Sequence, residues 1–200
     1  MIGVLALQGA VSEHITILQG LGASTRTVRT VHDLEGISGL VIPGGESTAI
    51  ARLAAGTGLF PEIRRRIDEG TVAVLGTCAG LILLSDTITP AASLPETIGG
   101  LPITTVRNGF GNQQESFEAE LGLLGRPMKV AFIRAPRIVN VRPEVRVLAS
   151  LRDEPVVVEY RNLLAATCHP EITGETALHE HLIDLSASLA PPSKLSGRGE

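Results

Sequence analysis

The chain has no tryptophan, and aromatic residues make up only 2% of its 200 residues. It therefore lacks the aromatic platforms, interleaved with basic side chains, on which single-stranded nucleic acids stack. Its one arginine triplet, Arg64-Arg65-Arg66, has acidic residues on both sides, and we expect it to form a solvated helix face. Because the net charge is also −4, we expect no nucleic-acid partner.

Long hydrophobic runs are absent as well, since no apolar segment approaches the roughly 18 residues that span a bilayer. We therefore expect no membrane segment. Residues 1–7 lack the basic start of a signal peptide and are typical of a first strand. Without an export signal, Cys78 and Cys168, the only two cysteines, are expected to be reduced thiols of a cytoplasmic protein.

Metal-ligand spacing is the third absence. His179 and His181 are two residues apart on an expected helix, which turns them roughly 200° from one another. They cannot hold one metal from one helix face. His14 stands beside Glu13 and is expected to be a surface or partly packed residue. We therefore expect no metal site.

The first half of the chain alternates strand and helix patterns. Strands are expected over 2–7, 23–29, 39–42 and 72–75, and helices over 12–21, 48–55 and 61–69. Short connections between such elements predict a doubly wound, mostly parallel sheet covered by helices on both faces, a three-layer α/β sandwich. With 44% hydrophobic residues, one domain is expected over 1–189 and a flexible tail over 190–200.

The second half changes character. Residues 87–102 hold three prolines and a Gly-Gly pair and are expected to form an exposed excursion. Six short strands and a closing helix over 173–189 follow, and we expect the strands to extend the sheet in antiparallel fashion. The strand candidates are 103–107, 116–120, 129–133, 145–150, 155–160 and 163–167, with a hairpin turn over 160–163.

The most informative stretch is 72–85, where a β-branched run ends in Gly-Thr-Cys-Ala-Gly and an apolar helix pattern follows. This spacing is the nucleophile-elbow pattern, with Cys78 at the apex between Gly76 and Gly80. Glycines relieve the crowding of so sharp a turn, and the N-terminus of the following helix favours a thiolate. Taken alone, the spacing fits a buried structural cysteine equally well.

A base for this cysteine is available at the end of the last expected strand, in Cys168-His169-Pro170-Glu171. The proline favours extended backbone at His169, so His169 and Glu171 are predicted to project together. The carboxylate can then orient the imidazole, which completes a Cys-His-Glu triad. Cys168 is expected to face the opposite side of the strand as a small core residue.

With both halves placed, the chain resembles the class I, triad-type glutamine amidotransferases. Five further stretches narrow the resemblance to the glutaminase subunits of pyridoxal 5′-phosphate synthase: LALQGA (5–10), PGGEST (43–48), VRNGFG (106–111), SFE (116–118) and FIRAP (132–136). The resemblance covers about residues 1–187. It implies hydrolysis of L-glutamine to glutamate and ammonia without a cofactor. It also implies a partner synthase subunit that receives the ammonia and makes pyridoxal 5′-phosphate.

The resemblance also assigns roles to residues. Cys78 would be the nucleophile, His169 the base and Glu171 its orienting group. The backbone N–H groups of Ala79 and Gly45 would hold the oxyanion, and the Gly44-Gly45 peptide could turn to assemble that hole only on docking. Gln8 would link the site to the partner, although a plain turn residue fits it equally well. The family's glutamine-binding positions fall on Gly45, Glu46, Ser47, Arg107, Ile133 and Arg134.

Two positions depart from the family pattern. Asn112 stands where many relatives have arginine, and Cys168 replaces the aromatic residue usual before His-Pro-Glu. Two other functions stay open from the sequence. One is the glutaminase subunit of another synthase, such as imidazole glycerol phosphate synthase, which shares the triad but not the Gly-Gly-Glu-Ser-Thr loop. The other is a non-catalytic regulatory subunit, against which the intact triad argues.

Overall fold

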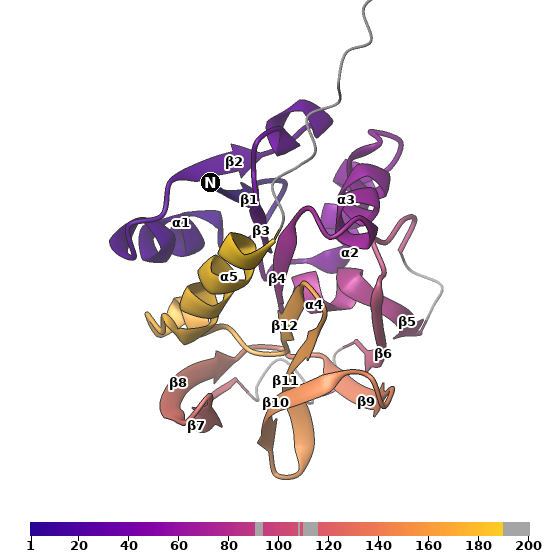
Figure 1. Ribbon diagram of the computed structural model, residues 1–200. Coiled ribbons are helices and arrows are strands. Elements are labelled where there is room, and N and C mark those ends of the chain that lie inside the picture. Colours follow the sequence, from indigo (N-terminus) through magenta and orange to yellow (C-terminus); the bar gives the residue numbers. More distant parts are fainter. Residues whose placement is uncertain (91–93, 108, 110–115, 190–200) are drawn as a thin grey trace, which may run out of the picture.

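The computed structural model describes residues 1–90, 94–107, 109 and 116–189 (Figure 1). The expected tail over 190–200 and the departure at Asn112 lie outside these residues. In chain order the elements are β1 (Ile2–Leu5), α1 (Val11–Gly20), β2 (Thr25–Val28), η1 (Val31–Leu34), β3 (Gly39–Ile42), α2 (Ser47–Ala54), α3 (Leu59–Asp68), β4 (Ala73–Thr77), α4 (Ala79–Leu84), β5 (Ser85–Thr89), β6 (Leu101–Val106), β7 (Phe117–Leu123), β8 (Arg126–Phe132), β9 (Arg137–Val141), β10 (Arg146–Leu151), β11 (Glu154–Tyr160), β12 (Leu163–Ala166), η3 (Pro170–Ile172) and α5 (Ala177–Ser188).

A seven-stranded sheet forms the centre, in the order β10-β11-β12-β4-β3-β1-β2. The five strands from β12 to β2 are parallel. β10 and β11 continue the sheet as an antiparallel edge. The predicted mostly parallel sheet with an antiparallel extension is therefore confirmed. β4 and β12 lie side by side in parallel at its middle, so Cys78 and His169 leave the sheet at the same end (Figure 1).

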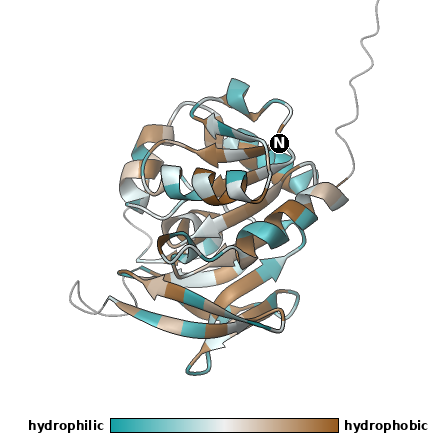
Figure 2. Cartoon of the chain, turned by 90° about the vertical axis from the view of Figure 1, so that its left-hand side faces the viewer, coloured by the Kyte–Doolittle hydropathy of each residue, from teal (hydrophilic) through white to brown (hydrophobic). Residues whose placement is uncertain are grey.

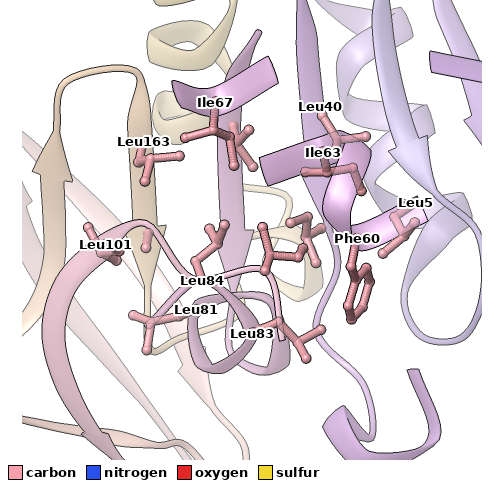
Figure 3. Packing of buried hydrophobic residues seen from close by; sticks show 14 of the residues in the cluster. Leu5, Leu40, Phe60, Ile63, Ile67, Leu81, Leu83, Leu84, Leu101 and Leu163 are labelled. Atoms are coloured by element: carbon pink, nitrogen blue, oxygen red, sulfur yellow. The ribbon is translucent and has the colours of Figure 1, made fainter. Parts of the chain in front are cut away.

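Because the central strands carry apolar side chains on both faces, helices cover both faces of the sheet. Alternate residues of one strand enter different cores: Leu40 and Ile42 of β3 pack with α2, α3 and α4, whereas Val41 packs with α1 and α5. Figure 3 shows the first of these clusters, with Phe60, Ile63 and the α4 leucines packed against one face of the sheet. The helices themselves carry hydrophilic and hydrophobic residues side by side (Figure 2).

Two arginines of the triplet, Arg64 and Arg65, lie on the outer side of α3, as predicted. Arg65 bridges the mostly covered Glu62 and the exposed Glu69, and Arg64 pairs with the exposed Asp68. Arg66 is more buried and donates to the Leu34 carbonyl at 2.6 Å. Exposed pairs of this kind contribute little to stability.

Several strand predictions in the second half are wrong in their pairing. β12 pairs with β4 in parallel, and only the 145–150 and 155–160 candidates extend the sheet in antiparallel fashion. β6 joins β5 and β9 in a separate three-stranded sheet, and β7 and β8 form a hairpin of their own. The expected excursion over 87–102 begins inside β5. Pairing is set by contacts between residues far apart in sequence, which a local pattern does not encode.

The C-terminal helix is shorter than expected. It starts at Ala177, because Gly174 adopts a left-handed φ of 70° that interrupts a helix. It is also the longest helix described, with 12 residues. Within the described ranges, none of the helices is long and apolar enough to cross a membrane.

Candidate active site

The expected strand, turn and helix around Cys78 are present. Cys78 stands between β4 and α4 with φ 48° and ψ −98°, a strained backbone for a residue with a side chain. Its N–H donates to the Ala166 carbonyl at 2.8 Å, which ties the turn to β12. A Cβ atom on Gly80 would lie 2.1 Å from the Ile42 carbonyl oxygen, so the elbow requires glycine there. The side chain of Cys78 is thus fixed at the end of the sheet.

His169 and Glu171 lie next to the cysteine. The imidazole of His169 is hydrogen-bonded to the Cys78 thiol, and its Nδ1 lies 2.7 Å from Glu171 Oε1. Both side chains are buried. The predicted proximity is observed, but its predicted cause is wrong: Glu171 lies in the 3-10 turn η3, not in extended chain. The N–H of His169 also donates to the Ala131 carbonyl of β8 at 2.8 Å, so the β7–β8 hairpin braces this turn.

The protonation state of His169 follows from these contacts. Burial lowers the pKa of His169, but its hydrogen bonds with Cys78 and Glu171 outweigh burial and raise the pKa to about 10. Near neutral pH the ring is therefore an imidazolium held between a sulfur and a carboxylate. A protonated ring in this place can give its proton to a leaving group beside the sulfur.

A second loop, Gly44-Gly45, closes over the histidine. The Gly44 N–H donates to Thr77 Oγ1 at 2.9 Å, and the Gly44 carbonyl accepts from the Ala10 N–H at 3.1 Å. A Cβ atom on Gly44 would meet the His169 ring at 2.3 Å, and one on Gly45 would meet Gln8 Oε1 at 2.5 Å. Glycine at both positions therefore allows the loop to approach the imidazole.

Glu46 follows this loop and caps helix α2. Its two carboxylate oxygens accept from the N–H groups of Thr48 at 3.0 Å and Ala49 at 2.6 Å. Partial burial alone would raise the pKa of Glu46, but these backbone donors outweigh it and lower that pKa. The Glu46 N–H donates to Gln8 Oε1 at 2.6 Å, so Gln8 is bound to the loop. Glu46 is thus a fixed negative charge beside the cleft.

Two arginines line the same cleft as Glu46. Arg107 donates to Thr48 Oγ1 at 3.0 Å and lies 3.6 Å from Glu46 Oε1. Arg134 follows β8, is exposed, and has a φ of 46° that turns the chain sharply after Ile133. The structure therefore places one anchored and one exposed guanidinium at the mouth of the site.

These residues enclose a cleft of about 680 Å³, its open mouth included. Its lining contains Cys78, His169 and every residue that the sequence assigned to glutamine binding, while Glu171 lies behind His169. The lining residues are Gln8, Gly45, Glu46, Ser47, Cys78, Ile82, Arg107, Ile133, Arg134 and His169. Ala79, assigned to the oxyanion, is buried at the start of α4 and does not line the cleft.

Sequence reasoning missed Ile82, although its position one helical turn after Cys78 on the same face could have indicated it. It also misplaced His14, which is fully buried rather than at the surface. Its Nδ1 lies 2.8 Å from His179 Nε2. The signal was present: His14 continues the inward stripe of α1 between Val11 and Leu18.

Cys168 is fully buried in the core on the α1 and α5 side, as predicted, and burial raises the pKa of its thiol. Unlike Cys78, it does not line the cleft. Among the residues that the structure describes, no three His, Cys, Asp or Glu side chains are grouped so as to hold a metal ion.

Residues 4–187 match the model of the SNO glutamine amidotransferase family. A curated protein from Clavibacter michiganensis subsp. michiganensis, "Pyridoxal 5'-phosphate synthase subunit PdxT", is 49% identical over 92% of this chain and 90% of that protein. A protein of the same name from Thermus thermophilus is 45% identical over 93% and 97%. A solved structure described as "Crystal structure of glutamine amidotransferase" has a TM-score of 0.89 at 42% identity, covering 93% of this chain and 98% of that one.

Proposed function

The chain belongs to the SNO glutamine amidotransferase family, and from this premise we propose that it is the glutaminase subunit of a pyridoxal 5′-phosphate synthase. Its single domain, residues 1–189, hydrolyses L-glutamine to L-glutamate and ammonia. The ammonia passes to a synthase subunit, which uses it to build pyridoxal 5′-phosphate. A cytoplasmic location is part of the proposal, because Cys78 must remain a reduced thiol to react.

The observation that carries the proposal is the hydrogen-bonded row from Cys78 through His169 to Glu171 at the floor of the cleft. A nucleophile, a proton carrier and an orienting carboxylate are the three parts of a triad. In this row His169 is the group that can exchange a proton with both sulfur and substrate. A merely structural cysteine needs neither partner.

In the first half-reaction Cys78 attacks the side-chain amide carbon of glutamine. The sulfur–carbon bond forms, and the thiol proton is held by His169. As the carbon–nitrogen bond breaks, His169 gives this proton to the departing amide nitrogen, which leaves as ammonia. The product on the chain is a γ-glutamyl thioester of Cys78.

In the second half-reaction water replaces ammonia. His169, now neutral, takes a proton from the water while its oxygen attacks the thioester carbon. The carbon–sulfur bond breaks, glutamate leaves, and the proton returns to the Cys78–His169 pair. Glu171 holds the imidazole in one orientation throughout, and its negative charge stabilises the imidazolium.

The rim of the cleft would bind the α-carboxylate and the α-ammonium group of glutamine. The α-carboxylate suits a guanidinium of Arg107 or Arg134, which can donate two parallel hydrogen bonds. The α-ammonium suits Glu46, whose carboxylate already faces Arg107 at 3.6 Å. Gly45, Ser47 and Ile133 complete the walls around the side chain.

The developing oxyanion would be bound by the N–H groups of Ala79 and Gly45. One such preorganised donor contributes about 3 kcal/mol to catalysis. The C=O and N–H of a trans peptide point in opposite directions, and the Gly44 carbonyl is held by Ala10. Turning the Gly44-Gly45 peptide would break that bond, so binding of the synthase subunit could change it through Gln8, which contacts Glu46 in the same loop.

Glutamate release by the full-length chain, alone and with its synthase subunit, tests this function. We expect wild-type activity that increases with the synthase and is lost in Cys78→Ala, because the thioester cannot form without the sulfur. Unchanged activity in Cys78→Ala would contradict an amidotransferase. Stimulation only by another synthase would contradict the partner, and absence of glutaminase activity in the complex would indicate a regulatory subunit.

A further inference from the structure

Behind the triad, on the side away from the cleft, lie two buried imidazoles that the reaction above does not use. His14 of α1 and His179 of α5 are both fully buried and are bonded to each other at 2.8 Å. The other ring nitrogen of His14, Nε2, lies 3.3 Å from Thr77 Oγ1 and 3.7 Å from Glu171 Oε2. One imidazole thus contacts both the triad carboxylate and the residue before Cys78.

The carboxylate needs such a neighbour. Glu171 uses Oε1 for His169, while Oε2 is buried and has no hydrogen-bond partner among the described residues. A buried carboxylate oxygen without a donor is costly. His14 Nε2 is the nitrogen that faces it.

The proton positions follow from this contact. If Nε2 of His14 lacked a proton, its lone pair would face the carboxylate oxygen in a site without solvent. A proton on Nε2 leaves Nδ1 as an acceptor, so His179 Nε2 must be the donor between the rings. His179 Nδ1 is then an unprotonated nitrogen, and none of the residues that the structure describes bonds to it at hydrogen-bond geometry. The carbonyl of Glu175 would favour a proton on His179 Nδ1 instead. Glu175 offers only a neutral carbonyl dipole, however, whereas Glu171 offers a charged carboxylate to a proton on His14 Nε2, and the charged acceptor is the stronger one.

We propose that His14 is a positioning residue of the triad: its Nε2–H faces Glu171 Oε2 and Thr77 Oγ1, and its Nδ1 accepts from His179 Nε2. Since Thr77 Oγ1 also accepts the Gly44 N–H, the same imidazole supports the carboxylate and the loop proposed to form the oxyanion hole. The proposal rests on the proposed glutaminase reaction.

Both imidazoles must be neutral for this role. Burial lowers the pKa of His14 to about 4, and it does the same for His179. The charged or titratable groups that face His14 are Glu171, which favours a charged ring, and His179 and His169, which oppose it. The two neutral imidazoles therefore orient Glu171 and leave its negative charge to stabilise the His169 imidazolium.

Steady-state kinetics of the full chain with its synthase subunit separate this role from simple packing. A glutamine side chain at position 14 can place its amide nitrogen where Nε2 of His14 lies, whereas an asparagine side chain is too short to do so. We expect His14→Gln to keep kcat within about threefold, and His14→Asn to lose about tenfold, equivalent to about 1.4 kcal/mol. KM for glutamine should stay within about twofold, since His14 does not line the cleft. His32→Gln, at an exposed histidine, is the matched control.

The pH profile supplies a second readout. In His14→Asn Glu171 is held less firmly against His169, whose raised pKa depends on that contact, so the alkaline limb of kcat/KM should move to lower pH. The Gln variant should restore the wild-type limb. Equal kcat and equal limbs in the Asn and Gln variants would overturn the proposal.

Nitrogen-15 NMR of the free full-length chain tests the tautomer without any activity. We expect the His14 signals to show a proton on Nε2 and none on Nδ1, with assignment from the loss of signals in His14→Gln. A proton on Nδ1 would overturn the proposal whatever the kinetics. Lack of glutamine hydrolysis by the wild-type complex would instead contradict the proposed function, so the two failures are distinguishable.

Discussion

The floor and the rim of the cleft are built differently. At the floor, Cys78, His169 and Glu171 are almost completely buried, and glycines with no room for a Cβ hold the surrounding backbone. At the rim, Glu46 and Arg107 face one another at 3.6 Å with the Glu46 side chain 49% exposed, and Arg134 is exposed. The groups proposed to react are thus held in place by the fold itself, whereas Glu46 and Arg107, proposed to bind the charged groups of glutamine, pair with one another.

The largest effect should come from removing the charge at the floor. Glu171→Gln keeps the shape but cannot stabilise the imidazolium, and kcat should fall about 10³- to 10⁴-fold. KM for glutamine should change little, because Glu171 lies behind His169. The measurement is kcat for glutamate release. A fall of less than about tenfold would show that catalysis does not depend on the Glu171 carboxylate.

The rigidity of the floor can be measured as stability. In Gly80→Ala the new Cβ would lie 2.1 Å from the Ile42 carbonyl oxygen, and the free energy of unfolding should fall by about 3 kcal/mol. Gly20→Ala is the matched control. In the described part of the chain no other group lies within 4 Å of its Cβ, so this change should be neutral or slightly stabilising. Urea denaturation checks both, and equal effects would contradict a tightly packed elbow.

The buried histidines behind the floor, His14 and His179, should make the stability of the protein depend on pH. His14 and His179 have pKa values lowered to about 4, so the unfolded chain binds protons that the folded chain excludes. Stability is therefore lost as pH falls from 6.5 towards 4, by about 2 kcal/mol per histidine at pH 5.

Denaturation at pH 7 and pH 5 measures this loss. His14→Gln should remove about half of it, whereas His32→Gln, at a histidine side chain 84% exposed, should keep it. An identical loss in His14→Gln would contradict the exclusion of protons from this region.

The smallest effect is expected at the rim. Arg107→Gln should raise KM for glutamine about tenfold and leave kcat within about threefold, because it would remove the proposed contact to the α-carboxylate, which is the same in the ground state and the transition state. Arg126→Gln, which breaks an exposed pair with Glu180, is the control. A loss confined to kcat would place Arg107 in the chemistry and remove the contrast between floor and rim.

The same contrast describes what sequence could predict. The floor rests on short-range patterns, a strand that ends in Gly-Thr-Cys-Ala-Gly and another that ends in His-Pro-Glu, and these place Cys78 and His169 at the same end of a parallel sheet. The separate β5-β6-β9 sheet and β7–β8 hairpin depend on pairing between distant strands. No local pattern distinguishes them from extensions of the main sheet.

The burial of His14 could be predicted only in part. Its place in the stripe of α1 points inward, but a histidine beside a glutamate is equally typical of a surface helix. Its partner, His179, is 165 residues away on α5, so the pair exists only once both helices cover the same face of the sheet. Likewise, the η3 turn that brings Glu171 to His169 is braced by β8, far away in sequence.

Trapping the covalent intermediate tests the central claim most directly. The full chain, turning over glutamine with its synthase subunit, is quenched in acid, digested and analysed by mass spectrometry. We predict a glutamyl group in thioester linkage on the peptide that holds Cys78, none on the peptide that holds Cys168, and none in Cys78→Ala. Glutamate formation with no adduct on Cys78, or an adduct on Cys168, would contradict the account.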